Sequence, residues 1–575
     1  MTVLIEKNVA IPMRDGVVLK ADVYRPAGAA RFPVLLQRTP YNKEFLPIVA
    51  MTLDPIRAAA AGYGVVIQDV RGRWASEGGV FSPYGNEEAD GADTLDWIAS
   101  QPFCDGNIGA YGLSYTGGTT WLCAVSGHPA LKAISPTTAP NDFWRDHFWR
   151  DGVSHLGTLA VWALRTIGPA ALVRIGLDPA TFGSRLIELV AAVDHFEDTL
   201  RQRPLNALAA AHPEDSRFVP FLFEIIRHPA PDAWTGALLF SDRHHRVRVP
   251  ALIIAGWHDL LLNADLSHYA GMRERGGSPD AREHTRLVIG PWSHAMFLNQ
   301  VGQVDFGFRS SGYLLDLRED LTLMQLRWFD RWLRGAETPA ESRVRIFVQG
   351  PNRWRGLDDW PDQQAMTRFW YLGAGGSLTP MPPAIHQPPD AYVYDPENPC
   401  PTCGGNLLMP AQYTPGPVDQ APILSRADVL AYTSEPLTED LEIVGPVSAL
   451  LYASSSGADT DWVVKLCDVH PDGRTLNLCD GVVRASYQNA CHGTTYHPGE
   501  AHPWEISLWS TAAVVQAGHR LRVLVTSSDF PRYDRNPNTG ENPFAATTAR
   551  PALQQVFHDP DRPSRIQMPI IARQA

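Results

Sequence analysis

A serine set between glycines, directly after a short apolar segment, constrains the fold of this chain more than any other feature. Residues 107–111 read Asn-Ile-Gly-Ala-Tyr, and residues 112–117 continue Gly-Leu-Ser-Tyr-Thr-Gly. Residues without bulk on either side of Ser114 let the chain turn sharply from a strand into a helix, which lifts the hydroxyl clear of a sheet. Because the pattern is short and the chain holds 46 glycines, it indicates a function only together with suitable partners.

Two later segments supply those partners. Residues 249–259 (Val-Pro-Ala-Leu-Ile-Ile-Ala-Gly-Trp-His-Asp) and 286–294 (Arg-Leu-Val-Ile-Gly-Pro-Trp-Ser-His) are each a buried-strand pattern with a polar end. Open α/β sheets place their chemistry at the carboxyl ends of strands, and the order Ser, Asp, His is that of the α/β-hydrolases. We therefore predict Ser114 as the nucleophile, His294 as its base and Asp259 as the acid that orients the imidazole.

Other residues compete for two of these roles. The rival bases nearby in sequence are His244, His245, His258 and His284. His258 directly precedes Asp259, so its side chain should diverge from the acid, and the other three lack a preceding apolar strand with a Gly-Pro break. Asp265 remains an alternative to Asp259 as the acid.

Five motifs in fixed order extend the pattern. They are Arg-Thr-Pro-Tyr at 38–41, Asp-Val-Arg-Gly-Arg-Trp-Ala-Ser-Glu-Gly at 69–78, Gly-Leu-Ser-Tyr at 112–115, Ala-Gly-Trp-His-Asp at 255–259 and Gly-Pro-Trp-Ser-His at 290–294. With them the chain resembles the cocaine-esterase-like serine hydrolases, which are related to the Xaa-Pro dipeptidyl-peptidases, α-amino-acid ester hydrolases and glutaryl-cephalosporin acylases. The resemblance covers nearly the whole chain but does not fix the substrate.

The resemblance also implies site residues beyond the triad. The Tyr41 hydroxyl is expected to complete an oxyanion hole with the backbone N–H of Tyr115, the residue after the nucleophile. Trp149 and Trp162 resemble a pair of aromatic residues that line the acyl pocket, although their spacing departs from the family pattern, and Leu261 is a weaker candidate for a substrate contact. From the residues themselves, Asp69 and Arg71 are expected to brace the loops beneath the serine as a pair.

The periodicity of apolar residues divides the chain. Strands alternating with helical runs in 1–140 and 243–335 predict an α/β domain with a mostly parallel sheet. Helical spacing in 141–242 predicts a cap folded over the face that carries the serine. From 336 to 575, including Val344, Ile346 and Val348, period-two patterns amid Pro and Gly predict a β-sandwich. The expected fold is therefore an α/β-hydrolase domain with an inserted helical cap and a C-terminal β-sandwich, which the resemblance implies is a jelly roll.

Charge and composition exclude several classes of protein. A net charge of −13 opposes binding to nucleic acid. The absence of a long uncharged apolar stretch opposes a membrane span, and Glu6 and Lys7 stand where a signal peptide would need apolar residues, so we expect a cytoplasmic protein. Seven cysteines suggest free thiols, and the one CxxC, Cys400 to Cys403, lacks a second ligand pair for zinc. We expect no metal and no cofactor.

These observations favour a serine hydrolase that cleaves a small-molecule ester or amide through an acyl-enzyme, most simply a carboxylic ester hydrolase or acylase. An Xaa-Pro dipeptidyl-peptidase or α-amino-acid ester hydrolase is the alternative, and it would need desolvated carboxylates to hold a substrate amine. The candidates are Asp142, Asp146, Asp151 and Asp232, although acidic residues on cap helices are usually a solvated face. An alternative of another class is an inert protein whose β-sandwich binds carbohydrate or a partner, against which the complete triad weighs. The resemblance leaves a homodimer open.

Overall fold

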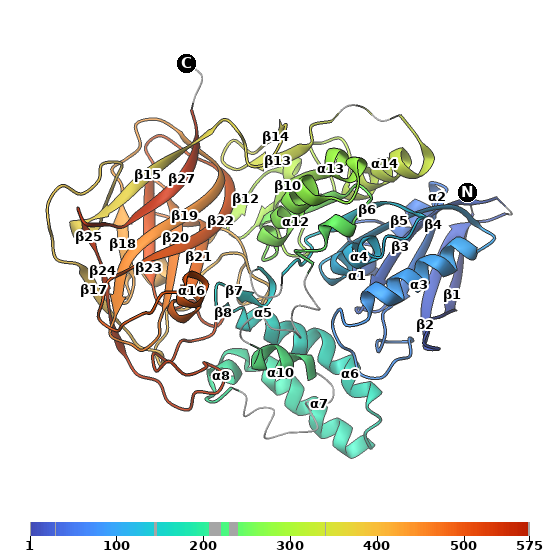
Figure 1. Cartoon of the computed structure of the whole chain (residues 1–575), viewed down its shortest axis with the longest axis horizontal. Helices are drawn as coiled ribbons and strands as arrows, with labels where there is room; N and C mark the ends of the chain where they lie inside the picture. The colour runs from blue at the N-terminus through green and yellow to red at the C-terminus, as the bar shows by residue number, and fades with distance from the viewer. Residues whose placement is uncertain are drawn as a thin grey trace.

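Two large β-sheets dominate the molecule, with a helical region packed between and beneath them (Figure 1). The computed structural model describes residues 2–28, 30–142, 146–205, 220–228, 240–337, 339 and 341–572. Within these ranges the first sheet has ten strands, which in sheet order are β1 (Val3–Pro12), β2 (Val18–Pro26), β4 (Gly64–Asp69), β3 (Phe32–Thr39), β5 (Cys104–Leu113), β6 (Leu131–Thr137), β9 (Leu252–His258), β10 (Arg286–Ser293), β13 (Val344–Val348) and β14 (Arg353–Leu357).

The centre of this sheet is parallel, as the alternation of strands and helices predicts. Pairing is parallel from β4 through β3, β5, β6, β9 and β10 to β13, and antiparallel for β1 with β2, β2 with β4 and β13 with β14. Every residue of β3, β4 and β9 is buried, because helices cover both faces of a parallel sheet. The covering helices are α2 (Pro55–Ala60), α3 (Glu87–Ser100), α4 (Tyr115–Val125), α12 (Leu262–Arg275), α13 (Pro279–His284) and α14 (Leu321–Arg334).

Helix α14 carries an apolar stripe that predicts a helix, with Leu326, Phe329 and Leu333 among its buried residues, and its ends have clear causes. The Asp320 side chain accepts the backbone N–H of Leu323 at 2.8 Å, which caps the first turn. Gly335 ends the helix in the left-handed conformation, with φ 68°.

The strands that follow α14 differ from expectation. Val344, Ile346 and Val348 were expected to open the C-terminal β region, but they form β13, which pairs in parallel with β10, and β14 then pairs with β13. A period-two pattern gives the conformation of a strand and which residues share a face, but not the sheet that the strand joins. The first sheet therefore continues to Leu357, past the boundary expected at 335/336.

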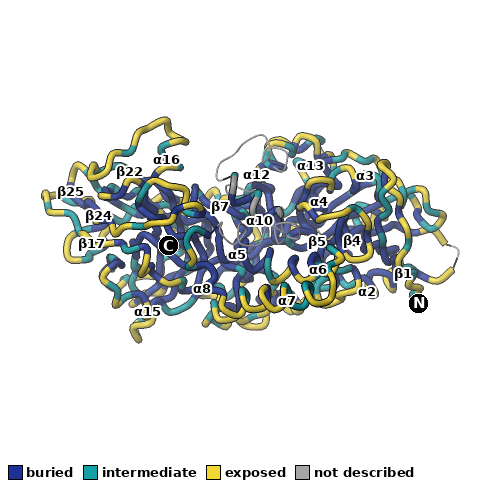
Figure 2. Tube along the Cα trace, turned by 90° about the horizontal axis from the view of Figure 1, so that it is seen from below, coloured by how far each residue is buried: buried dark blue, intermediate teal, exposed yellow. Residues whose placement is uncertain are grey.

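Between β6 and β9, helices predominate among the residues that the structure describes. The described elements of this region are β7 (Trp149–Arg150), β8 (Val153–Ser154), α5 (Leu156–Ala160), the π-helix η2 (Val161–Ile167), α6 (Gly168–Arg174), α7 (Pro179–Asp194), α8 (Phe196–Arg201), α10 (Pro220–Arg227) and the short 3₁₀ helix η4 (His244–Arg246). The apolar side chains of α7 pack only in part, because Leu189 is buried whereas Val190 is 48% exposed. Figure 2 shows this helix at the outer surface, below the buried strands.

One stretch of the cap, Leu156–Arg174, is long and apolar enough to cross a membrane by length and composition. Of its most apolar window, 67% is buried inside the protein. Apolar helices that pack in the core of a protein have this character.

The C-terminal region forms the second sheet. Its strands are β17 (Asp390–Tyr394), β24 (Ala552–Val556), β19 (Leu441–Ser455), β27 (Arg565–Ile571), β15 (Ala365–Gly373), β16 (Ser377–Thr379), β18 (Leu430–Thr433), β23 (Arg520–Thr526), β20 (Asp461–Val469) and β21 (Thr475–Arg484) in sheet order, with β22 (His502–Val515) paired to β19. A single parallel contact, Ser377 with Thr433, joins the half ending at β16 to the half beginning at β18. Residues of both halves, such as Leu451 and Leu466, share one buried cluster, so the two halves enclose a common core.

A buried ion-pair network joins the cap to the C-terminal region. The Arg150 guanidinium of β7 donates to Asp480 of β21 at 3.1 Å and lies over the Trp509 ring at 4.0 Å from its centroid. Arg532 donates to the same carboxylate at 2.8 Å. Burial opposes ionisation of Asp480, but Arg532 and Arg150 outweigh it and hold the pKa of this carboxyl well below its usual range.

Candidate active site

Ser114 stands at the sharp turn between β5 and α4, where the sequence predicts it. Its φ of 59° and ψ of −124° are strained for a residue with a side chain. The turn is so tight that a Cβ at Gly112 would collide with the backbone of Thr116. A Cβ at Gly117 would lie 2.8 Å from the Ala139 Cβ. The Thr116 hydroxyl fixes the turn further, accepting the N–H of Leu113 at 2.6 Å.

His294 and Asp259 meet Ser114 at this edge of the sheet. The Nε2 of His294 lies 2.9 Å from the Ser114 Oγ, and its Nδ1 lies 3.0 and 3.1 Å from the two carboxylate oxygens of Asp259. Asp259 is fully buried and His294 is 7% exposed. Because Nδ1 faces a carboxylate, it carries the proton in the neutral ring, which leaves Nε2 with a lone pair directed at the serine hydroxyl.

The rival residues lie elsewhere. Asp265 accepts the backbone N–H of Ala139 at 2.9 Å, and burial raises its pKa well above the usual value. The Nε2 of His258 lies 2.8 Å from the Gln349 side chain, and the Nε2 of His244 lies 3.0 Å from the Nδ1 of His268. Of these candidates, the structure brings only Asp259 and His294 to Ser114.

Tyr41 reaches the same point from the loop after β3. Two donors hold the preceding carbonyl, that of Pro40: Arg73 Nε at 2.9 Å and Trp74 Nε1 at 2.8 Å. The Tyr41 hydroxyl accepts the indole N–H of Trp162 at 3.2 Å. Burial raises its pKa, although hydrogen bonds with Trp162, Ser114 and the backbone of Tyr115 act in the opposite direction. Tyr41 therefore stays protonated and can donate beside the serine.

Aromatic rings surround this hydroxyl. Trp162 stacks on Tyr115 with ring centroids 6.1 Å apart and packs against Phe221 of α10 at 5.1 Å. Phe81 and Phe148 complete the described cluster, at 6.3 and 5.7 Å from Trp162. Trp162 of the cap thus brings an aromatic cluster against Tyr41 and against Tyr115, the residue after the serine.

Two of the expected substrate contacts lie differently. Trp149 packs its ring against Phe544 of the C-terminal region, with centroids 5.8 Å apart, so it sits at the interface between cap and C-terminal region. Leu261 is buried beside Leu408, and its backbone N–H donates to Asp259 at 2.7 Å. Of the three expected contacts, Trp162 alone is seen here in contact with Tyr41 and Tyr115.

Asp69 and Arg71 do not brace the loops as a pair. Asp69 binds the Lys43 ammonium at 3.1 Å, whereas Arg71 binds Asp90 at 2.6 Å and Asp15 at 2.7 Å. Asp69 is the last residue of β4 and Arg71 lies beyond it, and each binds its own partner.

Sequence reasoning missed one residue of this site, Asn406. Its side-chain amide donates to the backbone carbonyl of Asp259 at 2.8 Å and to that of Trp257 at 3.1 Å. It comes from the C-terminal region and is 8% exposed. The Gly-Gly pair that precedes it marks a tight turn, but only the folded chain reveals its partner 147 residues away.

Two of the four acidic candidates of the cap, Asp142 and Asp146, are buried rather than part of a solvated face. Asp142 and Asp146 are 5% and 1% exposed, and the Asp146 carboxylate accepts the N–H of Asp142 at 2.9 Å. His147, which follows them, is buried close to His294; burial first, and His294 second, lower its pKa to about 3. Asp151 lies apart, with its carbonyl accepting the N–H of Arg484, and Asp232 falls outside the described residues.

A parallel sheet of this order, with a serine at a strained strand-to-helix turn and a buried His–Asp pair beside it, defines an α/β-hydrolase-type serine hydrolase. Comparisons with known proteins agree. Residues 15–296 match the model of the X-Pro dipeptidyl-peptidase (S15) family, and residues 337–567 match that of the X-Pro dipeptidyl-peptidase C-terminal non-catalytic domain.

The relatives are similar over their full lengths. Cocaine esterase from Rhodococcus sp. (strain MB1 Bresler) is 38% identical, with 99% of each chain covered. Among solved structures, an aminopeptidase from a marine sediment Thaumarchaeota archaeon has a TM-score of 0.83 at 28% identity, with 99% of this chain and 96% of that chain covered. An α-amino acid ester hydrolase has a TM-score of 0.80 at 29% identity, with the same coverage. The chain therefore belongs to the cocaine-esterase-like serine hydrolases of the S15 family, and it is a hydrolase.

Proposed function

We propose that this protein is a carboxylic ester hydrolase in which Ser114, His294 and Asp259 form the catalytic triad. The observation that carries the proposal is the unbroken line of contacts from Asp259 through His294 Nδ1 and Nε2 to the Ser114 Oγ, at 3.0 and 2.9 Å. A hydroxyl is a poor nucleophile unless a base takes its proton as it attacks, and His294 is in position to do so.

The reaction then proceeds in two halves. Ser114 Oγ attacks the ester carbonyl while its proton moves to His294 Nε2, and Asp259 stabilises the imidazolium that forms. Collapse of the tetrahedral intermediate expels the alcohol, which takes the proton from His294 and leaves an acyl-serine. Water attacks this ester in the same way, with His294 again as the base, and the carboxylic acid departs with Ser114 restored.

The oxyanion of each intermediate needs donors fixed in advance. We assign this role to the Tyr41 hydroxyl and the backbone N–H of Tyr115. Tyr41 is supported by the contacts that hold its loop and by the raised pKa that keeps its proton in place. Preorganised donors stabilise the charge as it develops, because they need no reorientation when the oxyanion forms.

The aromatic cluster around Trp162 points to an ester with an apolar or aromatic acyl group. Trp162, Phe81, Phe148 and Phe221 offer planar apolar surface next to the serine, and aromatic rings prefer such partners. We keep Trp149 and Leu261 as proposed substrate contacts, which only a larger substrate would reach.

Labelling by a fluorophosphonate tests the triad. Wild-type protein should form a covalent adduct and hydrolyse aryl esters, whereas Ser114→Ala should do neither while keeping its melting temperature. A wild type that resists the probe, or labelling that persists in Ser114→Ala, would overturn the proposal.

A second candidate is the hydrolysis of α-amino-acid esters or of Xaa-Pro peptides. The burial of Asp142 and Asp146 favours it, since a desolvated carboxylate beside the site could bind a substrate amine. Comparing kcat/KM for aminoacyl-proline anilides with that for simple aryl esters decides between the two. Preference for the anilides, lost in Asp146→Asn, would replace the first candidate with the second.

We further infer a division into a catalytic domain with a cap and a C-terminal jelly roll. The order of strands and the match to a non-catalytic C-terminal domain support it, with the boundary moved beyond β14. A cytoplasmic location is proposed from the seven cysteines, all of them free thiols.

A further inference from the structure

A cavity of about 360 Å³ opens at the end of the first sheet opposite to His294. The sheet lines it with the first residues of β9 and β10, Leu252 and Arg286 to Val288, and with Arg345 of β13. Helix α14 contributes Met324, Arg327, Trp328 and Arg331, and the segment before this helix contributes Asp316 and Glu319. The cavity therefore shares strand β10 with the triad but faces the other way.

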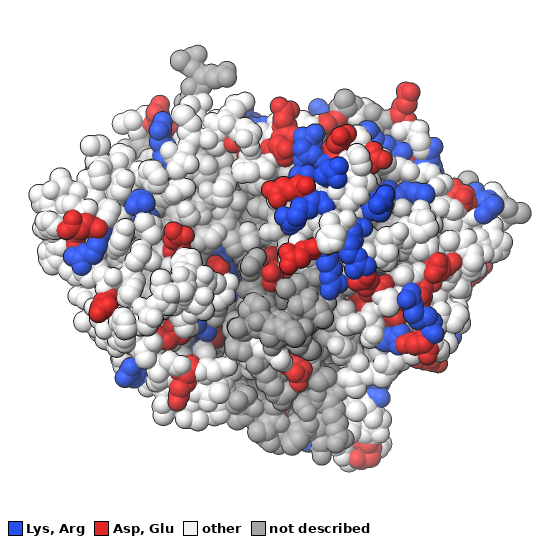
Figure 3. Space-filling view, viewed as in Figure 1, with Lys and Arg blue, Asp and Glu red and all other residues white. Residues whose placement is uncertain are grey.

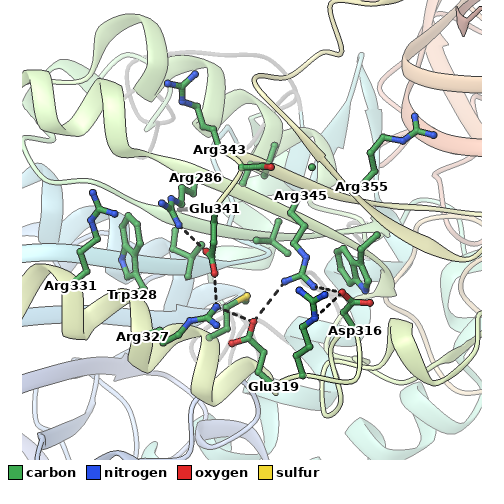
Figure 4. Close-up of a pocket in the computed structure, with 18 residues that line it drawn as sticks. Arg286, Asp316, Glu319, Arg327, Trp328, Arg331, Glu341, Arg343, Arg345 and Arg355 are labelled. Carbon is green, nitrogen blue, oxygen red and sulfur yellow. Dashed lines mark hydrogen bonds and ion pairs between the residues drawn. The ribbon is translucent and has the colours of Figure 1, made fainter. Parts of the chain in front are cut away.

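Arginines dominate the lining. Seven of the 18 lining residues are arginines, against three acids, Asp316, Glu319 and Glu341. Figure 4 shows side chains from β10, β13 and α14 converging on the hollow. On the surface, Lys and Arg gather over this part of the molecule together with Asp and Glu, whereas the C-terminal region on the left carries few charges (Figure 3).

The three acids of the cavity are outnumbered by the arginines that bind them. Glu341 binds Arg286 and Arg327 at 2.8 Å each, and Glu319 binds Arg327 at 3.0 Å. Asp316 is shared by Arg309 at 2.9 Å, Arg345 at 3.5 Å and Arg318 at 3.7 Å. Five guanidinium groups thus share three carboxylates.

Two further pairings on the rim do not remove this excess. Arg343 lies 3.7 Å from Asp359 and Arg355 binds Glu442, both acids outside the cavity. Burial lowers the pKa of Arg286 and of Arg345 despite their acidic neighbours. The surrounding carboxylates therefore compensate these two cations only in part.

We propose that this cavity binds a small oxyanion carrying at least two negative charges, held by Arg286, Arg327 and Arg345. These three side chains come from three different elements, β10, α14 and β13, and line a common space. The planar fork of a guanidinium matches two oxygens of a carboxylate or phosphate, and several forks around one hollow select for multiple charges. The site is separate from Ser114, so it adds a ligand to the proposed hydrolase.

The volume of the cavity and its apolar floor further limit the size and kind of ligand that can bind. A cavity of about 360 Å³ is at the lower end of the size of small-molecule sites. Its floor is apolar, formed by Leu252, Leu287, Met324 and Trp328. The ligand is therefore a compact di- or trivalent anion rather than a nucleic acid or an acidic protein segment.

Calorimetric titration of the full-length protein tests the site. The probes are inorganic pyrophosphate and citrate, each added at constant ionic strength, so that phosphate and carboxylate chemistry are told apart. We expect one saturable site for at least one probe, and binding weakened at least tenfold in Arg345→Gln and in Arg286→Gln. The matched control is Arg474→Gln, which makes the same charge change at an exposed arginine paired with Asp472, and it should bind like the wild type.

Two results would overturn the proposal: no saturation by either probe up to about 5 mM, or equal weakening by Arg474→Gln, which would mean a response to overall charge. If the cavity variants fail to fold, a crystal of the wild type soaked in tungstate replaces them. Anomalous density between Arg286, Arg327 and Arg345 supports the site, and density only elsewhere refutes it. Each readout is independent of ester hydrolysis, so failure of the proposed activity would leave this test valid.

Discussion

Replacing Tyr41 with phenylalanine removes one hydroxyl from the proposed oxyanion hole and leaves the ring in place. The ring packs edge-on against Tyr115 with centroids 6.5 Å apart, and phenylalanine keeps that contact. Loss of one preorganised donor costs about 10²- to 10³-fold in kcat, or about 2.7–4 kcal/mol. Because the oxyanion forms only in the transition state, KM should change much less than kcat.

The indole of Trp162 supplies the matched control. It donates to the Tyr41 hydroxyl at 3.2 Å. Trp162→Phe therefore removes this hydrogen bond but leaves the Tyr41 hydroxyl in place. A neutral hydrogen bond of this kind contributes about 0.5–1.5 kcal/mol, so kcat should fall by about tenfold or less. The assay is steady-state hydrolysis of an aryl ester, with the melting temperature measured alongside. A Tyr41→Phe enzyme within about threefold of wild-type kcat would refute the assignment, since another donor would then complete the hole.

Three further changes probe the framework of the site. Asp480→Asn removes the carboxylate that Arg150 binds and leaves Arg532 only Asp529, at 3.6 Å, so it should lower the free energy of unfolding by about 3–5 kcal/mol in urea titrations. Because the pKa of Asp480 is lowered in the folded protein, its contribution is present above the unfolded pKa of about 3.9 and lost as the pH falls below it, so the difference between variant and wild type should shrink in acid. Asn406→Ala should lower kcat by about tenfold or more by releasing the backbone of Asp259, and an unchanged kcat would rule out that positioning role. Gly112→Ala should yield little soluble protein, because its Cβ meets the backbone of Thr116, and a well-folded variant would disprove this steric account.

Local sequence patterns identified most helices and strands of the fold, but not always the strand with which a strand pairs. Helix α14 was predictable because its stripe, cap and terminal glycine all lie within 15 residues of one another in the chain. Strand β13 was recognisable as a strand, yet its partner β10 is more than 50 residues away, and period-two alternation is the same in either sheet. The assignment of a strand to a sheet depends on tertiary packing, which a single sequence encodes only globally.

The residues of the candidate site also differ in whether the sequence alone could locate them. Ser114, Asp259 and His294 could be located because each follows an apolar strand, and the parallel sheet brings such ends together. Trp149 and Trp162 could not be told apart, since both lie in apolar cap segments and only the folded cap shows which ring contacts Tyr41.

The amide of Asn406 bears on how this architecture can be altered. A side chain from the C-terminal region clamps the two carbonyls on either side of His258, so the catalytic half is not a self-sufficient module. Chimeras that exchange this region between relatives should keep full turnover only when the donor sequence restores an equivalent amide at that place. Truncation to a minimal hydrolase, a common route to smaller biocatalysts, would leave the strand end that carries the acid without its brace.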